Sequence, residues 1–308
     1  MRNSSLFRTW LAFLLFPLSV LGLILVGVAF FFLTLPDVRE LKGCMTTSMY
    51  QVKLCPGDGR YTPLSQIAPE LVDAVVASED ASFFFHHGFD WHEIQESFST
   101  NLRQIGFKRG GSTLTQQLAK NVFLTKEKSL LRKVREAALT VALEKNFSKK
   151  ELIERYLNVV EFGPNIYGVR AAAQYYFGKA PSQLHVLDAA FLAFLLPNPK
   201  GYSKSFQQKT LTPFAQKMVR QIVRRLGGFK KISPQVMNMA LANVDQFPWS
   251  HLSRGSFIDD FAPTETEPSS EQIEQVQQMM EEESPAPNEN AAPDPSEAAD
   301  PDESSTWD

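Results

Sequence analysis

Glu79 is the residue of this sequence best placed to act as an acid or base. It ends an apolar helical stretch that begins at Leu71, and an aromatic-rich segment follows it. The aromatic residues are Phe83, Phe84, Phe85, Phe89 and Trp91. Aromatic neighbours exclude water from a carboxylate, which raises its pKa toward the range of a general base. The alternative is that Glu79 and Asp80 simply end a helix in solvent.

A glycine-rich turn follows at Gly110 and Gly111, and Ser112 is placed to cap a helix that runs through Lys120. The start of such a helix offers free backbone N–H groups and a positive dipole end, which suit a phosphate or another anion. An ordinary capped helix is the alternative. The run Thr115, Gln116 and Gln117 argues against it, because an ordinary helix would not cluster polar groups there.

A third group consists of Lys128, Arg132 and Glu136, spaced four residues apart on a helix capped by Ser129 and running to about Asn146. These charges could form a solvated ladder of ion pairs worth only ~0.3 to 0.5 kcal/mol each. Taken alone, the segment favours that interpretation.

The order and spacing of four motifs resemble the peptidoglycan glycosyltransferases of glycosyltransferase family 51, over residues 35 to 228. The motifs are Glu79-Asp80-x-x-Phe83-x-x-His86-x-Gly88, Gly111-Ser112-Thr113-x-Thr115-Gln116-Gln117-x-x-Lys120-Asn121, Arg132-Lys133-x-x-Glu136 and Lys150-Glu151-Leu152-Ile153-Glu154-Arg155-Tyr156-Leu157-Asn158.

The resemblance implies an all-α, lysozyme-like glycosyltransferase domain after a single N-terminal transmembrane helix. It implies an inverting reaction that polymerises lipid II into β-1,4-linked glycan strands and releases undecaprenyl diphosphate. Inversion at a sugar requires a base on one face and stabilisation of the leaving group on the other.

Residue roles also follow from the resemblance. Glu79 is the expected general base, and Glu136 is expected beside the donor diphosphate. The expected diphosphate contacts are the cations Lys120, Lys128 and Arg132 and the polar residues Ser112, Gln116 and Gln117. Lys128 stands where the family commonly has arginine, so it keeps the charge but loses the bidentate geometry.

The resemblance further implies Mg²⁺ or Mn²⁺ as a cofactor and no organic cofactor. The partners it implies are lipid II, the growing glycan strand, the membrane and cell-wall synthesis proteins, and they do not include nucleic acid. A lysozyme-like glycan-cleaving enzyme and a non-catalytic membrane scaffold are the alternatives. No Ser-x-x-Lys with a later Lys-Thr-Gly follows residue 256, so we expect no transpeptidase.

Residues 10–35 contain no charged residue, and 26 residues exceed the ~20 that cross a bilayer as a helix. Arg2 and Arg8 precede this span, which predicts a retained signal anchor with residues 1–9 in the cytoplasm. The glycosyltransferase domain, residues 36–255, would then lie on the periplasmic or extracellular side of the cytoplasmic (inner) membrane. Cys44 and Cys55 follow the span, and an oxidising compartment favours a disulfide between them.

The net charge of −3 conceals an uneven distribution. Residues 259–308 contain 16 acidic residues and no Lys or Arg, so residues 1–258 hold 31 basic and 18 acidic residues, a net charge of +13. A basic body suits nucleic acid, anionic lipid or a lipid diphosphate, and charge alone does not choose among them. The composition of residues 256–308 predicts a disordered acidic tail, with a short helix at 271–283.

The remaining segments predict helices, and no alternating pattern predicts a strand or hairpin. Ser65 is a candidate cap for the helix that ends at Glu79, and Ser148 with Glu151 forms a capping box. An apolar stretch from Asp188 is expected as a buried helix. Helices are also expected at 90–105, before a basic loop at 105–109, and at 214–226, where the basic face suits either solvent or a membrane surface.

Overall fold

The computed structural model describes residues 3–91, 94–95, 111–127, 129–257, 271–272 and 275. The chain divides into two compact units, residues 1–38 and residues 39–308. Most of the predicted acidic tail, the loop at 105–109 and most of the helix predicted at 90–105 lie outside the described residues.

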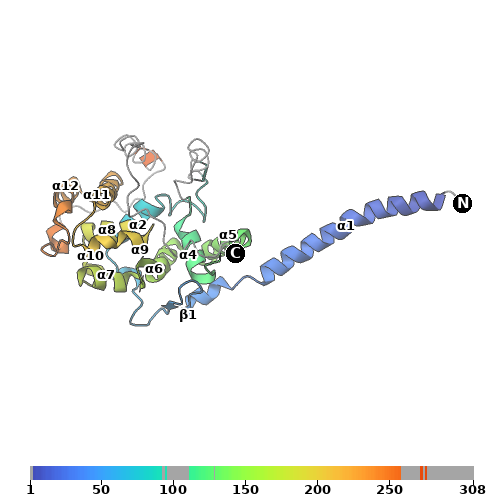
Figure 1. The fold of residues 1–308 in the computed structure, drawn as a ribbon, viewed down its shortest axis with the longest axis horizontal. Helices are drawn as coiled ribbons and strands as arrows, with labels where there is room; N and C mark the ends of the chain where they lie inside the picture. Colours follow the sequence, from blue (N-terminus) through green and yellow to red (C-terminus); the bar gives the residue numbers. More distant parts are fainter. Residues whose placement is uncertain are drawn as a thin grey trace. The chain divides into compact units, whose positions relative to one another are not determined.

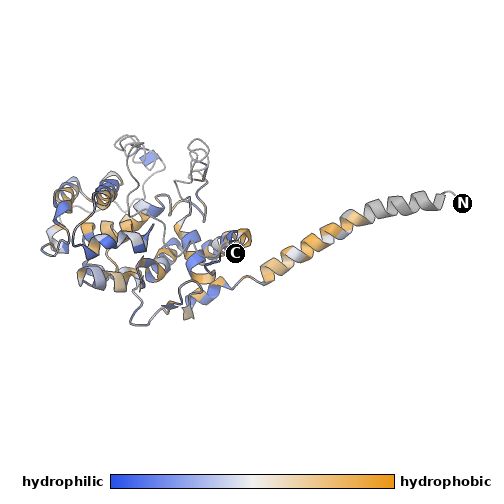
Figure 2. Ribbon diagram, viewed as in Figure 1, coloured by the Kyte–Doolittle hydropathy of each residue, from blue (hydrophilic) through white to orange (hydrophobic). Residues whose placement is uncertain are grey.

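The first unit consists mainly of helix α1 (Asn3–Leu33). It contains a segment long and apolar enough to cross a membrane, judged by length and composition, with a mean hydropathy of 2.7 and none of it buried. Figure 2 shows this apolar character along the coloured part of α1. A signal sequence near an N-terminus would meet the same criterion. The predicted span at residues 10–35 therefore coincides with a helix of suitable length.

The second unit is mostly helical, as the sequence predicts (Figure 1). Its longer helices are α2 (Pro69–Glu79), α4 (Leu114–Phe123), α5 (Leu130–Asn146), α6 (Lys149–Val159), α7 (Val169–Phe177), α8 (Val186–Leu195), α11 (Pro213–Gly228) and α12 (Pro234–Asn243). Shorter helical segments are η1 (Val38–Lys42), η2 (Leu64–Gln66), η3 (Pro181–Gln183), α9 (Pro199–Tyr202), α10 (Lys204–Gln207), η4 (Val244–Gln246) and η5 (Arg254–Phe257).

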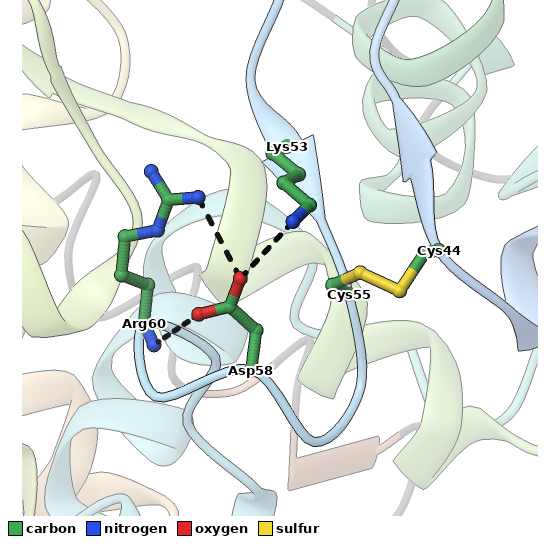
Figure 3. The surroundings of a disulfide bond; sticks show 5 residues. All are labelled: Cys44, Lys53, Cys55, Asp58 and Arg60. Atoms are coloured by element: carbon green, nitrogen blue, oxygen red, sulfur yellow. Dashed lines mark hydrogen bonds and ion pairs between the residues drawn. A yellow bond between two sulfur atoms is a disulfide. The ribbon is translucent and has the colours of Figure 1, made fainter.

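Two small antiparallel hairpins correct the expectation of a body without strands. Strand β1 (Met45–Thr46) pairs with β2 (Lys53–Leu54), and β3 (Glu161–Gly163) pairs with β4 (Ile166–Tyr167). Strands of two or three residues are too short to show an alternating pattern, which explains why the sequence did not reveal them. A disulfide between Cys44 and Cys55 closes the first hairpin just beyond its strand ends (Figure 3).

The core is built around α8, whose ten residues are all buried. Figure 1 shows α8 beside α2, and α11 packs against both helices. A second cluster joins α4 to α5 and α6. The expectation of a buried helix after Asp188 is confirmed, because the apolar stretch is surrounded by protein on every side.

The helix caps partly agree with the sequence. Ser129 caps α5, and Ser148 forms a capping box with Glu151 at the start of α6, as predicted. Ser65 is not a cap, because α2 begins at Pro69 after Ala68. Ser112 is not a cap either. Thr113 caps α4, which displaces the predicted start of that helix by one residue.

The fourth motif is mainly structural. Tyr156 and Leu157 are buried in α6. Asn158 accepts a hydrogen bond from Thr62 N and donates one to Thr62 O, at 2.8 and 2.9 Å. Phe257 is also buried, so the folded body extends past the predicted boundary at residue 256.

Substitution of Gly168 tests how closely the backbone between β4 and α7 approaches α6. Its φ of +81° disfavours a side chain, and a Cβ there would lie 2.7 Å from the carbonyl oxygen of Asn158. We expect Gly168→Ala to lower the free energy of unfolding by about 3 kcal/mol, because the backbone strain adds to the collision. Urea unfolding of the detergent-solubilised protein measures this loss.

Gly178 is the matched control, with a φ of +64° and no atom within 4 Å of a Cβ. Gly178→Ala carries only the conformational cost of about 1 kcal/mol. Equal losses in the two variants would contradict the close approach of Gly168 to Asn158.

Candidate active site

Glu79 is the last residue of α2, and two other helices hold its side chain. The Gln117 Nε2 atom of α4 donates a hydrogen bond to Glu79 Oε2 at 2.9 Å. The Tyr156 hydroxyl of α6 donates to Gln117 Oε1 at 3.1 Å. Because the amide oxygen of Gln117 faces a hydroxyl donor, its NH₂ group faces the carboxylate. The hydrogen-bonded line from Tyr156 through Gln117 to Glu79 thus directs the Gln117 NH₂ group toward the carboxylate.

The surroundings of Glu79 suit a base. Burial raises the pKa of the Glu79 carboxyl above its usual 4.5, as the sequence led us to expect. The hydrogen bond from Gln117 acts in the opposite direction, the charge of Asp80 raises the pKa further, and the charges of Lys120 and Arg225 lower it. A carboxylate with a raised pKa takes up a proton more readily than one in water.

Lys120 links this glutamate to the second one. Burial lowers the pKa of the Lys120 ammonium, and the negative charges of Glu136 and Glu79 oppose that shift. Lys133 and Arg132 lower the pKa of Lys120 further, because all three groups are cations. Lys120 is therefore within electrostatic reach of both glutamates and of both cations of α5.

Glu136 is 4% exposed and lies on α5. The Lys133 ammonium donates a hydrogen bond to Glu136 Oε1 at 2.5 Å, while the Lys133 side chain itself is 57% exposed. Arg132 Nη1 lies 3.4 and 3.3 Å from the carbonyl oxygens of Thr125 and Lys126, which it contacts as a donor. Glu136 thus holds the Lys133 ammonium, and the two backbone carbonyls hold the Arg132 guanidinium. Both cations therefore have defined positions at one end of the cluster.

The described residues thus bring together Glu79, Gln117, Lys120, Arg132 and Glu136. Gln117 contacts the candidate base, in addition to any role toward a ligand. Gln116 is 5% exposed, and its side-chain oxygen accepts a hydrogen bond from the Thr113 N–H as part of the cap of α4. Its place is therefore structural. Lys128 lies outside the described residues, and Ser112 is half-buried just before the cap.

Comparison with known proteins supports this arrangement of motifs. The Transglycosylase family model matches residues 48–226, more than half of the chain. The chain belongs to the transglycosylase family. The match includes both glutamates, Lys120, Arg132 and the whole of the fourth motif.

Similar curated proteins share the family of this transglycosylase. A biosynthetic peptidoglycan transglycosylase of Nitrosospira multiformis is 42% identical over 167 residues, which cover 54% of this chain and 71% of the relative. Proteins of the same name from an Azoarcus species and from Acinetobacter baumannii are 48% and 49% identical over 146 and 136 residues. Those segments cover 47% and 44% of this chain and 63% and 60% of the relatives, so less than two thirds of either one.

Sequence reasoning missed Arg225 of this transglycosylase. The sequence places it on an amphipathic basic helix, which suggested a solvent or membrane face. In the structure, α11 packs against α2, Arg225 Nη1 donates a hydrogen bond to Ala77 O at 3.1 Å, and its charge acts on Glu79. No local signal distinguishes Arg225 from the neighbouring Arg224, because the contact depends on how two distant helices pack.

Asp80 and His86 of the first motif have a structural role. Asp80 is 2% exposed and accepts a hydrogen bond from Leu114 N at 2.9 Å. His86 Nδ1 accepts from Gly88 N, so the neutral ring carries its proton on Nε2, which donates to Asp80 at 2.9 Å. This network joins the end of α2 to the start of α4 and so places Glu79 beside Gln117.

The residues present do not fit a divalent ion held by protein ligands alone. No group of three or more His, Cys, Asp or Glu side chains that could hold a metal occurs among the described residues. Glu136 also has a lysine ammonium on one of its oxygens. Mg²⁺ is usually held by one or two carboxylates together with substrate phosphates, so any ion here would need the substrate to complete its coordination.

The hydrogen bond from Gln117 to Glu79 leads to a prediction of how the reaction rate of this transglycosylase depends on pH. A base must be ionised to accept a proton, so kcat/KM rises with pH through the pKa of Glu79. We expect this acidic limb to lie above pH 4.5, the usual pKa of glutamate. Gln117→Ala removes a donor that favours the ionised form, so we expect the limb to move to higher pH. Initial rates across a pH series measure the shift.

Arg225→Ala should move the limb in the same direction, because it removes a positive charge near Glu79. Arg224→Ala, an exposed substitution on the same helix, is the matched control and should leave the limb in place. A limb that does not move in Gln117→Ala or Arg225→Ala would show that Glu79 is not the group that titrates.

Proposed function

We propose that this transglycosylase polymerises lipid II into β-1,4-linked glycan strands and releases undecaprenyl diphosphate. Membership of the transglycosylase family, together with relatives named biosynthetic peptidoglycan transglycosylases, makes it a peptidoglycan glycosyltransferase. The observation that carries the mechanism is the position of Lys120, which acts electrostatically on Glu79 at one end of the cluster and on Glu136 at the other.

Glu79 supplies the base. The 4-hydroxyl of the acceptor GlcNAc attacks the anomeric carbon of the MurNAc at the end of the growing strand, and the Glu79 carboxylate takes the hydroxyl proton. The bond from that carbon to the diphosphate breaks, so an α linkage is replaced by a β linkage. Gln117 keeps the carboxylate in place until the proton arrives.

Lys120, Arg132 and Lys133 form the cationic end of the site. Negative charge grows on the bridging oxygen of the diphosphate as the bond breaks, and fixed cations there stabilise the transition state. Glu136 is buried and bonded to Lys133, so its role is to orient a cation. The three cations outnumber this single carboxylate, which leaves net positive charge for the diphosphate.

Membrane attachment fits a lipid-linked substrate. Helix α1 is consistent with a membrane anchor, and by the distribution of Arg2 and Arg8 we place the domain outside the cytoplasmic membrane. On α5, Leu130, Leu131 and Val134 are 88%, 53% and 55% exposed. The helix that carries Arg132 and Glu136 therefore has an apolar surface that suits contact with a bilayer.

Glu79→Gln tests the proposal directly. Incubation with purified lipid II should yield glycan strands with the unsubstituted protein, and the variant should be about 10²- to 10⁴-fold slower because the base is lost. Glu127→Gln, an exposed carboxylate on the loop before α5, is the control and should retain activity. Gel separation of labelled strands gives the rates.

Incubation with preformed glycan separates the alternatives. Loss of strands without any strand growth from lipid II would favour a lysozyme-like cleaving enzyme. Undiminished polymerisation by Glu79→Gln would show that another residue is the base. Neither reaction in a folded, membrane-bound protein would indicate a scaffold.

We also propose that Mg²⁺ or Mn²⁺ assists by binding the oxygens of the substrate diphosphate. Removal of divalent ions with EDTA should then lower the polymerisation rate, and added Mg²⁺ or Mn²⁺ should restore it. An unchanged rate after chelation would show that Lys120, Arg132 and Lys133 neutralise the leaving group unaided.

A further inference from the structure

A pocket that the proposed reaction does not use lies on the catalytic unit. Its volume is about 550 Å³, within the range of roughly 300 to 1,000 Å³ of small-molecule sites. The first hairpin, the segment after it, α6 and the start of α7 form its walls. The side chains that define its chemistry are Tyr50, Tyr61, Tyr167, Lys53, Arg60 and Arg170.

The pocket combines aromatic surface with positive charge. Among the described residues that line it there are three tyrosines and three cations, and none is acidic. The rings of Tyr50 and Tyr167 lie 5.0 Å apart between centroids, at an interplanar angle of 35°. A tyrosine face with a hydroxyl at its edge suits a ligand that has both apolar and hydroxyl-bearing surfaces, and arginine suits carboxylates.

Some of these groups are already occupied and others face the pocket with donors to spare. Asn158 bonds to Thr62, and Tyr61 donates to Glu154 Oε1. By contrast, the side chains of Arg170 and Gln174 have no hydrogen-bond or ion-pair partner within the part of the chain that the structure describes. The side chains of Arg170 and Gln174 are therefore available to a ligand.

The hairpin wall is also held firmly. The Cys44–Cys55 disulfide joins its ends, and Asp58 contacts both Lys53 and Arg60 (Figure 3). The Asp58 carboxylate lies 3.5 Å from Lys53 Nζ and 3.6 Å from Arg60 Nη2. Asp58 also accepts the Arg60 backbone N–H at 3.1 Å. One carboxylate thus holds two cations together on this wall of the pocket.

The loop between α4 and α5, which precedes Arg132, reaches this pocket. The Lys126 ammonium lies over the Tyr50 ring, 5.5 Å from its centroid, and Arg132 holds the carbonyl of Lys126. The hairpin is bonded to the end of α4 through Ser48 N and Val122 O at 2.7 Å. The pocket and the cationic end of the active site therefore share one connecting segment.

We propose that this pocket binds a disaccharide-peptide unit of the glycan strand, with its sugars against Tyr50 and Tyr167 and its peptide carboxylates at Arg60 and Arg170. The proposal rests on the proposed function, which makes that strand the product. Such a unit carries both hydroxyl-bearing rings and carboxylates, the combination that the lining selects. A strand held at a second site stays attached between additions, so the pocket would favour longer products.

Binding tests the pocket without turnover. The probe is soluble GlcNAc-MurNAc-pentapeptide, titrated by calorimetry into the full-length protein in detergent. We expect binding that falls about tenfold or more in the double variant Arg60→Ala/Arg170→Ala, because charge-assisted bonds to carboxylates are lost. Both side chains are exposed, and the Arg60 backbone bond to Asp58 remains, so folding should be intact. Lys217→Ala, an exposed cation on α11, is the control and should bind normally.

Two comparison probes show whether the two arginines bind peptide carboxylates or anionic lipid. The same disaccharide without its peptide should bind more weakly. Vesicles of phosphatidylglycerol should bind the double variant and the unsubstituted protein equally. Equal binding of the peptide-bearing probe by both proteins, or a loss that appears only with vesicles, would overturn the proposal.

Strand length gives an independent measure. With lipid II, the double variant should begin at the unsubstituted rate but produce shorter strands, because no catalytic group is changed. Strands of unchanged length would overturn the proposal. Failure of the unsubstituted protein to polymerise lipid II would refute the proposed function instead, and the binding result would still decide whether the pocket takes this ligand.

Discussion

The site depends on the hydrogen-bonded line from Tyr156 through Gln117 to Glu79. Each of these residues comes from a different helix, so the line holds only while α6, α4 and α2 keep their relative positions. Burial makes an ionised glutamate costly, and a donor aimed at it offsets part of that cost. The hydroxyl of Tyr156 determines which end of the Gln117 amide faces the carboxylate. The partly buried Glu79 carboxylate thereby keeps one defined hydrogen bond.

The arrangement of charge follows from the same packing. Lys120 lies one turn after Gln117 on α4, so the helix that orients Glu79 also places a cation within electrostatic reach of both glutamates. On α5, Lys133 and Glu136 are three residues apart and bond to each other. The short spacing explains how a buried carboxylate is tolerated at this position. Lys133 compensates its charge while remaining largely exposed to a ligand.

Motif residues of this family serve two different purposes. Glu79, Lys120 and Arg132 present charge that a substrate can use, whereas Asp80, Thr113 and Gln116 are buried and bonded to protein. Thr113 also donates to Gly88 O at 2.8 Å, which ties the first motif to the second. A motif residue with a fixed spacing can therefore have a structural role and no chemical one. The reason is that a buried polar group needs a hydrogen-bond partner in the protein.

The local pattern of the sequence determined the longer helices, the caps at Ser129 and Ser148 and the buried stretch after Asp188, and it marked Glu79 and Glu136 as the candidate functional carboxylates. These features depend on residues within a few turns of one another. Only the tertiary structure decided that Gln117 bonds to Glu79, the candidate base, and that Arg225 acts on Glu79 from α11. A side chain's partner across 38 or more residues depends on how helices pack, and no local periodicity records that distance.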